Sequence, residues 1–345
     1  MTKPTAGARV PADDGQNLAY KFRHGYPAGS ILVRRPAFHM TRRKMFLGAV
    51  LAILGLPLVL GLIAAASIYV FDETNGMIVS SGHERKYLLH VPKSYDRAKP
   101  APLVISMHGA GAWPAHQMNA SRWNRLADEH GFIVVYPSGA DFIPRIWPMG
   151  GSEGNDDVRF ISDLIDKLQG AYNIDPTRIY ADGLSNGGGM AFALSCKLSD
   201  RIAAVGAVAA AQLLPFGWCK DPRAVPMIAF HGTADPVVPY KGGRTWKAPA
   251  PTPYPDVSEW VANWARRNQC EPRPVESAVA AHAVRREYTS CAQDAAVVLY
   301  TIDGGGHTWP GGKPQAEWWN GPNTSEVDAT ALMWAFFLKH PLRNK

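Results

Sequence analysis

The residues that decide the fold read Asp-Gly-Leu-Ser-Asn-Gly-Gly-Gly at positions 182–189. Within them, residues 183–187 have the pattern G-x-S-x-G, with Ser185 at its centre. A strand-like run at 178–181 precedes the pattern and a helix-like run at 189–198 follows it, which is the context that a nucleophile elbow requires. Side chains on either side of the serine would clash in so tight a turn, which accounts for the glycines. We therefore predict that the Ser185 hydroxyl stands exposed above the end of a sheet.

Two later segments supply an acid and a base in the order Ser…Asp/Glu…His that an α/β-hydrolase requires. Residues 226–240 read PMIAFHGTADPVVPY, in which Asp235 follows an apolar strand. Residues 297–312 read VVLYTIDGGGHTWPGG, in which His307 follows a strand in a glycine-rich loop. Because ligands of open α/β sheets bind at the C-terminal ends of the strands, we predict that Ser185, Asp235 and His307 meet there.

A fourth segment has the form of a loop that supplies an oxyanion hole. An apolar strand at 102–107 is followed by His-Gly-Ala-Gly-Ala at 108–112. One backbone N–H from such a loop and the N–H of the residue after the nucleophile, Asn186, form the hole. Each donor is worth roughly 3 kcal/mol of transition-state stabilisation. We interpret His108 as a residue that orders the loop rather than as a catalytic one.

These residues predict covalent catalysis by a serine, with no metal and no organic cofactor. Ser185 attacks an ester carbonyl while His307 accepts its proton and later protonates the leaving alcohol. Asp235 holds the imidazole of His307 in its working tautomer and stabilises the imidazolium. Water then releases the acyl group by the same path.

The chain resembles the esterase family of polyhydroxybutyrate depolymerases and related feruloyl esterases. The resemblance covers about residues 75–342 and is carried by HGAGA, YADGLSNGGGMAFALSC, HGTADPVVPY and YTIDGGGHTWPGG. It implies the same catalytic triad and assigns the oxyanion N–H groups to Ala110 and Asn186. It also implies the substrates, which are short polyester oligomers, or acyl and aromatic (feruloyl) esters on polysaccharides.

Two other functions remain open on the sequence. A serine peptidase of the same fold would use the same three side chains on amides. A non-catalytic envelope-binding module would keep the fold without the reaction, although a retired enzyme typically loses its serine or histidine. The sequence favours a carboxylesterase.

Three tryptophans are candidates for contact with the substrate. Trp309 follows His307 by two residues, Trp246 belongs to a Pro-rich loop at 241–257, and Trp147 belongs to the segment 142–154. An aromatic wall suits a feruloyl ring and an apolar polyester chain equally, so these residues do not identify the ester. Core packing is the alternative for each.

The N-terminal part predicts a membrane anchor. Residues 45–71 contain no charged side chain and exceed the ~20 apolar residues that a membrane-spanning helix needs. Residues 1–44, rich in Gly, Pro and charge, carry nine Lys and Arg against two Asp, so we expect a mostly disordered tail that stays in the cytoplasm by the positive-inside rule. We expect a single-pass signal anchor in the cytoplasmic membrane, with the lipid bilayer as partner and a catalytic domain at 72–345 on the periplasmic or extracellular side. Cleavage after residues 64–66 stays open.

The charge distribution argues against nucleic-acid binding. The chain has a net charge of +7, and the N-terminal tail accounts for all of it. The part after residue 44 is therefore neutral and lacks the basic surface that a nucleic acid requires.

All four cysteines follow the predicted membrane span, at positions 196, 219, 270 and 291. An even count in an oxidising compartment indicates disulfides, and three pairings are possible. Pairing of sequence neighbours, Cys196–Cys219 and Cys270–Cys291, closes loops of ~20–25 residues, and the family resemblance favours it. Four free thiols are the alternative. The cysteine spacing does not suggest a metal site.

Strands and helices alternate along the chain as an α/β-hydrolase fold requires. We predict strands at 77–80, 86–91, 102–107, 132–136, 177–181, 203–209, 226–230, 284–289 and 296–302. We predict helices at 118–130, 157–170, 186–198, 256–268 and 325–339. The first two strands form an antiparallel edge, and the others form a mostly parallel central sheet flanked by helices. One transmembrane helix precedes this domain.

Overall fold

The computed structural model describes residues 73–139, 144–148, 156–211, 219 and 223–343, and two single residues, Gly55 and Val59. Apart from those two, the described residues belong to the unit Leu62–Lys345. The predicted tail at 1–44 and all but two residues of the predicted membrane span at 45–71 thus lie outside them. Within the described ranges, no helix is both long and apolar enough to cross a bilayer.

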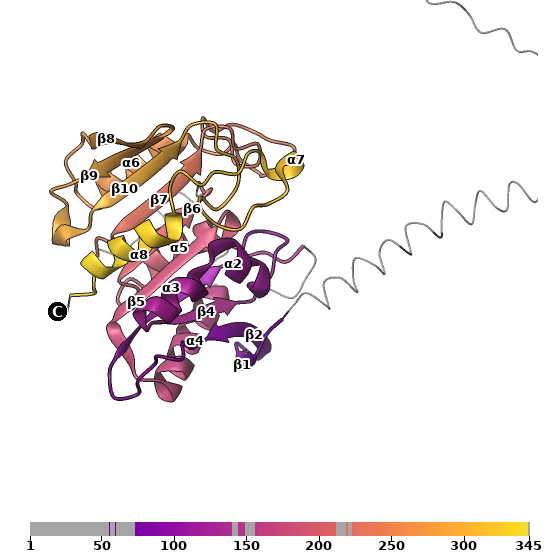
Figure 1. Ribbon diagram of the computed structural model, residues 1–345, viewed down its shortest axis with the longest axis vertical. Helices are drawn as coiled ribbons and strands as arrows, with labels where there is room; N and C mark the ends of the chain where they lie inside the picture. The colour runs from indigo at the N-terminus through magenta and orange to yellow at the C-terminus, as the bar shows by residue number, and fades with distance from the viewer. Residues whose placement is uncertain are drawn as a thin grey trace, which may run out of the picture. The chain divides into compact units, whose positions relative to one another are not determined.

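A ten-stranded sheet forms the centre of the domain, in the order β1-β2-β4-β3-β5-β6-β7-β10-β9-β8 (Figure 1). Six neighbouring strands are parallel: β4 (Ile133–Pro137), β3 (Ala101–Met107), β5 (Ile174–Leu184), β6 (Ala204–Val208), β7 (Met227–Gly232) and β10 (Val297–Ile302). Four outer strands are antiparallel: β1 (Gly76–Ser80) and β2 (His83–His90) at one edge, β9 (Ala283–Tyr288) and β8 (Val275–Ala280) at the other. The predicted mostly parallel sheet and its antiparallel first pair are confirmed.

Helices cover both faces of the sheet, because parallel strands bury side chains on both sides. Along β3, Leu103 and Ile105 belong to one hydrophobic core and Val104 to the other. The first core contains side chains of three helices: α4 (Asp156–Ala171), α5 (Asn186–Lys197) and α6 (Val257–Arg267). The second contains side chains of two: α3 (Trp123–His130) and α8 (Ala329–Lys339). This is the layered α/β architecture that the sequence predicts.

Some boundaries differ from the prediction. The helix predicted at 118–130 is two helices, α2 (Pro114–Ser121) and α3, because Arg122 adopts a left-handed conformation with φ of 58°. α8 begins at Ala329 rather than at 325, because the side chain of Asp328 caps it by accepting from the N–H of Ala331. Strand β8 and the short helix α7 (Glu317–Asn320) were not predicted.

Two disulfides join sequence neighbours, Cys196 to Cys219 and Cys270 to Cys291. They confirm the predicted pairing. Disulfides persist in oxidising compartments and are rare in the cytosol, so these bonds are typical of a domain that works outside the cytoplasm.

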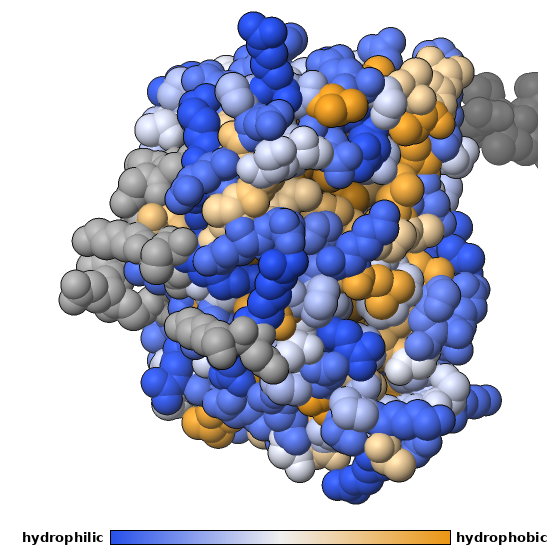
Figure 2. Space-filling view, turned by 90° about the vertical axis from the view of Figure 1, so that its left-hand side faces the viewer, coloured by the Kyte–Doolittle hydropathy of each residue, from blue (hydrophilic) through white to orange (hydrophobic). Residues whose placement is uncertain are grey.

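The surface is largely hydrophilic. Figure 2 shows one face, on which polar and charged residues predominate and apolar residues gather in smaller patches. Exposed large apolar side chains occur on both outer strands, β1 and β8, and two of the exposed side chains are tryptophans, Trp246 and Trp318. Single exposed apolar residues are ordinary, whereas the indoles of Trp246 and Trp318 both pack against a third indole, that of Trp319.

Candidate active site

Ser185 occupies a strained turn between β5 and α5. Its backbone has φ of 55° and ψ of −117°, a conformation that a residue with a side chain adopts only when its surroundings enforce it. The N–H of Ser185 donates to the carbonyl of Val208 at 2.8 Å, and the N–H of Gly189 donates to the carbonyl of Ser185 at 3.1 Å. These bonds to a neighbouring strand and to the following helix hold the serine in place.

The glycines on either side of Ser185 are required by close backbone contacts. A Cβ at Gly183 would lie 2.3 Å from the carbonyl carbon of Gly187. A Cβ at Gly187 would lie 2.2 Å from the carbonyl oxygen of Met107, the last residue of β3. The turn is so tight, and lies so close to the end of the neighbouring strand β3, that positions 183 and 187 accommodate only glycine.

Asp235 and His307 lie together because β7 and β10 are neighbours in the sheet. Nδ1 of His307 lies 2.7 Å from Oδ2 of Asp235, and the Asp235 side chain is fully buried. The two loops are also joined through their backbones, since the N–H of Ala234 donates to the carbonyl of Gly305 at 2.9 Å. The structure thus brings the predicted acid and base into direct contact.

The surroundings of Asp235 keep its side chain ionised. Oδ1 accepts from the N–H groups of Val237 and Val238, each at 2.8 Å. On the other oxygen, Nε2 of His231 lies 3.3 Å away. Burial by itself raises the pKa of Asp235, but the charge of His307 and hydrogen bonds from His231 and His307 outweigh it and hold the pKa well below its usual range. Asp235 is therefore a carboxylate at neutral pH.

Ser185, Asp235 and His307 follow the C-terminal ends of β5, β7 and β10, so all three lie at one edge of the sheet. Among the described residues, hydrogen bonds join Asp235 to His307 but do not join the Ser185 hydroxyl to His307. Catalytic hydrogen bonds are often long in ligand-free proteins and tighten when substrate binds. The arrangement places the predicted nucleophile and the predicted acid–base pair at the same edge of the sheet.

The predicted oxyanion loop lies against Ser185. A Cβ at Gly109 would be 3.5 Å from the Cβ of Ser185, so the loop that contains Ala110 passes close to the serine. Asn186 begins helix α5, and its side-chain amide accepts from the N–H of Trp147 at 2.6 Å and donates to the carbonyl of Trp147 at 3.1 Å. Both predicted donors therefore belong to segments that meet at the elbow.

His108 orders this loop. Its Nε2 accepts from the N–H of Gly139 at 3.0 Å, so Nδ1 is the protonated nitrogen and donates to the carbonyl of Gly109 at 2.8 Å. Burial lowers the pKa of His108 to about 3. A neutral imidazole with both nitrogens occupied fits the structural role that the sequence indicates.

The three predicted substrate contacts lie in different surroundings. Trp246 is 77% exposed, whereas Trp147 and Trp309 are 1% and 2% exposed. The indole N–H of Trp147 donates to the carbonyl of His108 at 2.9 Å, and that of Trp309 donates to the hydroxyl of Thr330 at 2.8 Å. Substrate contact stays a prediction for all three, and burial favours the packing alternative for Trp147 and Trp309.

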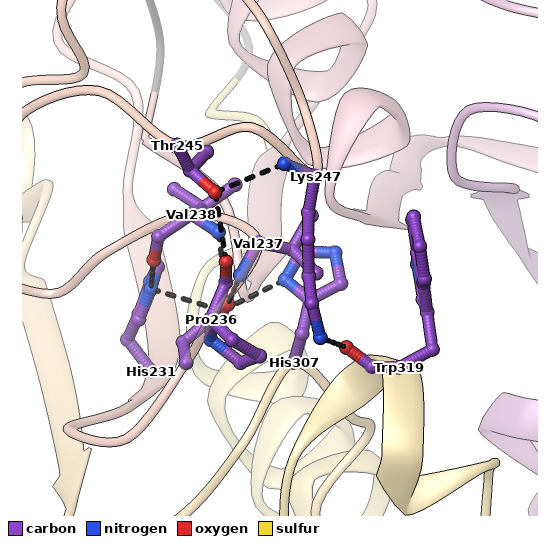
Figure 3. Close-up of polar contacts among 9 residues, drawn as sticks. His231, Pro236, Val237, Val238, Thr245, Lys247, His307 and Trp319 are labelled. Atoms are coloured by element: carbon purple, nitrogen blue, oxygen red, sulfur yellow. Dashed lines mark hydrogen bonds and ion pairs between the residues drawn. The ribbon is translucent and has the colours of Figure 1, made fainter.

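Sequence reasoning missed two features of the site. The first is the contact of His231 with Asp235, for which the only signal is a histidine four residues before the acid. The second is Lys247, whose Nζ donates to the carbonyl of Trp319 at 2.5 Å and joins two loops beside His307 (Figure 3). Within the described ranges, no group of three or more His, Cys, Asp and Glu side chains is placed to hold a metal ion.

A second buried acid lies beneath the elbow. Asp182 is fully buried three residues before Ser185, and its Oδ1 accepts from the hydroxyl of Ser106 at 2.6 Å. The amide of Gln117 donates to that hydroxyl at 2.9 Å. Burial raises the pKa of Asp182 to about 7. Within the described residues, no Lys, Arg or His side chain bonds to Asp182, in contrast to Asp235, so the Asp182 carboxyl group is mostly protonated below neutral pH.

Comparisons with known proteins agree with this architecture. Residues 86–220 match the family described as Esterase PHB depolymerase. Feruloyl esterase B of Piromyces equi is 32% identical over 235 residues, which are 66% of this chain and 44% of that protein. The putative esterase NocK of Nocardia uniformis subsp. tsuyamanensis is 32% identical over 255 residues, which are 68% of this chain and 73% of that protein. The chain thus spans less than half of the first relative and nearly three quarters of the second.

Among solved structures, the acetyl xylan esterase from Aspergillus awamori superposes with a TM-score of 0.54. The match covers 76% of this chain and 98% of that one at 16% sequence identity. At this identity the likeness concerns the fold alone.

Proposed function

Because the chain belongs to the Esterase PHB depolymerase family, we propose that it is a serine carboxylesterase in which Ser185, His307 and Asp235 form the catalytic triad. The family match and the esterase relatives class the chain as a hydrolase of carboxylic esters. The observation that carries the triad is the buried 2.7 Å contact between His307 and Asp235, at the same sheet edge as the strained turn of Ser185.

The proposed reaction proceeds through an acyl-enzyme. Oγ of Ser185 attacks the carbonyl carbon while Nε2 of His307 takes the hydroxyl proton, and the carbonyl oxygen becomes an oxyanion. The C–O bond to the alcohol then breaks, and His307 returns the proton to the leaving oxygen. Water, deprotonated by His307, attacks the acyl-enzyme and releases the carboxylic acid and the free serine.

Two groups of interactions stabilise the charges that develop. The N–H groups of Ala110 and Asn186 are the proposed donors to the oxyanion. The ionised Asp235 stabilises the imidazolium of His307, and it is prepared for this role because two backbone N–H groups hold its other oxygen at 2.8 Å. Stabilisation by groups that are already oriented needs little reorganisation during the reaction.

The proposed substrates are short polyesters and acyl or feruloyl esters. They follow from the family to which the chain belongs and from its similarity to a feruloyl esterase. An exposed aromatic side chain, Trp246, beside the site supports a substrate with an apolar surface.

We also propose that residues 45–71 anchor the enzyme in the cytoplasmic membrane, with the catalytic domain on the outer side. An uncharged run of this length and the basic residues before it support the proposal, and so do the two disulfides. Alkaline carbonate extraction of membranes from cells that make the full chain tests the anchor. Release of the full-length chain into the soluble fraction would overturn it.

The triad is tested by substitution of the nucleophile. The purified full chain is assayed on p-nitrophenyl butyrate, methyl ferulate and 3-hydroxybutyrate oligomers, and Ser185→Ala is expected to lower kcat by roughly 10⁴-fold or more. Ser277→Ala, at an exposed position on β8, is the matched control and retains full activity. Residual activity of Ser185→Ala within tenfold of the wild type would contradict the assignment, provided that circular dichroism shows a folded variant.

A further inference from the structure

Helix α2 follows the predicted oxyanion loop and buries no large apolar side chain. The loop ends at residue 112, and α2 begins at Pro114. The buried side chains of α2 belong to one proline, two alanines, one glutamine and one serine. Because the hydrophobic effect grows with the apolar area that is buried, it contributes little to the placement of this helix. Polar contacts must therefore fix where α2, and with it the loop, lies.

Gln117 bonds α2 to the two strands beneath the serine turn. Nε2 of Gln117 donates to the hydroxyl of Ser106 in β3 at 2.9 Å, and this hydroxyl donates to Oδ1 of Asp182 in β5 at 2.6 Å. All three residues are fully buried. β3 leads into the predicted oxyanion loop, and β5 leads into the turn of Ser185. The glutamine thus ties the helix to both of the strands that carry these parts of the site.

Thr330 of α8 bonds the other end of α2 to the segment after His307. Its hydroxyl donates to the carbonyl of Ser121 at 2.5 Å and accepts from the indole N–H of Trp309 at 2.8 Å. The direction of both bonds is fixed, because an indole N–H only donates and a carbonyl only accepts. Thr330 and Trp309 are 3% and 2% exposed. A single buried hydroxyl therefore joins the last residue of α2 to an indole two residues from His307.

Backbone contacts reinforce the junction between α2 and the His307 loop. The N–H of Lys313 donates to the carbonyl of Ala120 at 3.2 Å. Gly312 lies so close to that carbonyl oxygen that a Cβ at this position would overlap it. The segment 309–313 therefore packs directly on the C-terminal end of α2, and a shift of the helix would be transmitted to the loop that carries His307.

A hydrogen bond within α2 connects its two ends. The hydroxyl of Ser121 donates to the carbonyl of Gln117, one helical turn earlier, at 2.7 Å. Hydrogen bonds thus link six buried residues in series, from the strand before the serine turn to the segment after the histidine. We call them the buried polar chain: Asp182, Ser106, Gln117, Ser121, Thr330 and Trp309.

We propose that the buried polar chain positions the oxyanion loop between Ser185 and His307, with Thr330 as its central positioning residue. The proposal rests on the esterase function and the triad proposed above. Donors to an oxyanion must be oriented before the charge develops, and a displacement of about 1 Å far from the reacting atoms can lower the rate by about 10²-fold. A defect in the chain therefore lowers kcat and leaves KM nearly unchanged, whereas loss of a substrate contact would raise KM.

Substitution of Thr330 in the full chain tests the proposal. Thr330→Val nearly keeps the volume of the side chain but removes the hydroxyl, which leaves the indole N–H of Trp309 and the carbonyl of Ser121 without this partner. On p-nitrophenyl butyrate we expect kcat to fall by about tenfold or more and KM to stay within about twofold of the wild type. Inhibition by a heptyl trifluoromethyl ketone, which forms an oxyanion adduct with Ser185, should weaken by the same factor as kcat falls. Thr330→Ser keeps the hydroxyl and is expected to restore kcat to within about threefold.

Two Trp→Phe variants separate positioning from a general loss of stability. Trp309→Phe removes the indole donor to Thr330. Trp264→Phe removes an equally buried indole donor, which bonds the carbonyl of Val225 at 3.0 Å in the other hydrophobic core. We expect Trp309→Phe to lower kcat by about fivefold or more, whereas Trp264→Phe retains the kcat of the wild type. Circular dichroism and thermal midpoints accompany the kinetics, and this pair decides the question if Thr330→Val does not fold.

Three results would overturn the positioning role of the buried polar chain. The first is a folded Thr330→Val whose kcat lies within about twofold of the wild type. The second is an equal loss of kcat in Trp309→Phe and Trp264→Phe, which would mean that any buried defect slows the reaction. The third is a rise of KM without a loss of kcat in Trp309→Phe, which would assign the indole to the substrate. Failure of the triad is distinguishable from all three, because hydrolysis would then persist in Ser185→Ala.

Discussion

Nε2 of His231 lies 3.3 Å from Oδ2 of Asp235, the same oxygen that contacts His307. Nε2 also lies 2.9 Å from the carbonyl of Val238, so the ring donates from this nitrogen toward both oxygens. His231 is 1% exposed and packs edge-on against Tyr240. A second histidine therefore fixes the position of the acid from the side opposite to His307.

This contact predicts that His231→Phe lowers kcat and leaves KM nearly unchanged. Loss of one hydrogen bond to a charged group corresponds to about tenfold or more in rate. Steady-state kinetics on p-nitrophenyl butyrate measure it, with His83→Phe on the exposed part of β2 as the control. An unchanged kcat in a folded His231→Phe would show that His307 and the backbone suffice to orient Asp235.

The glycines of the elbow predict a large difference between two Gly→Ala substitutions. In Gly183→Ala the new Cβ meets backbone atoms of Gly187 and Gly188, the nearest at 2.3 Å, so we expect a loss of about 3 kcal/mol or more, or no folded protein. Gly170, near the end of α4, has open space at its Cβ, and Gly170→Ala is expected to stabilise the helix by about 0.5–1 kcal/mol. Thermal unfolding compares the two, and equal midpoints would contradict the close contact at the elbow.

The raised pKa of Asp182 predicts that the free energy of unfolding falls as the pH rises. Its pKa is raised by burial to about 7 in the folded state and is about 3.9 in an unfolded chain, so folding retains a proton that the unfolded chain loses. The stabilisation by this proton is fully present below about pH 4 and is lost as the pH rises to 7. Asp182→Asn removes the titration but keeps an oxygen for Ser106, and it should lose less stability than the wild type between pH 5 and 8.

The measurement for Asp182 is the thermal midpoint of both proteins across that pH interval. Burial also raises the pKa of Asp157, so the comparison with the variant, rather than the wild-type curve alone, isolates Asp182. Parallel curves for the two proteins would mean that Asp182 is ionised in the folded domain at pH 5.

The disulfides predict a thermal midpoint that falls on reduction. The sequence separations of 23 and 21 residues correspond to roughly 3 kcal/mol for each bond by loop-closure entropy. Differential scanning fluorimetry with and without dithiothreitol measures the shift. The variant Cys270→Ser/Cys291→Ser shows how much of that shift comes from the Cys270–Cys291 bond. A midpoint that does not respond to dithiothreitol would contradict a structural role for both bonds.

The central strands and the candidate site residues could be predicted because short stretches of sequence suffice to identify them. β3, β7 and β10 are apolar runs that end in glycine-rich or proline-rich loops, so both the strands and the residues after them stand out. β8 could not be predicted, because Val275–Ala280 is an edge strand whose residues are nearly all exposed, without the alternation that burial of one face imposes. The break at Arg122 depends on one left-handed residue, which helical periodicity does not report.

The surroundings of the aromatic residues could not be predicted, because exposure follows from packing rather than from residue type. Trp309 lies two residues after His307, yet its indole is buried and donates to Thr330. Trp318 is further from His307 in the sequence and is nevertheless 81% exposed. The contact of His231 with Asp235 likewise depends on how the loop after β7 turns back, which a spacing of four residues does not determine.

The contact between Gly187 and the carbonyl of Met107 limits which parts of this enzyme can be altered by substitution. Two segments of the proposed reaction centre meet there through main-chain atoms, so no substitution of a side chain adjusts the distance between the serine turn and the strand that leads into the predicted oxyanion loop. The loops that carry Trp246 and Trp318 have no such constraint at the indoles, which are open to water. Directed evolution for a new ester should therefore accumulate its substitutions in those loops, while the geometry of bond cleavage is inherited unaltered.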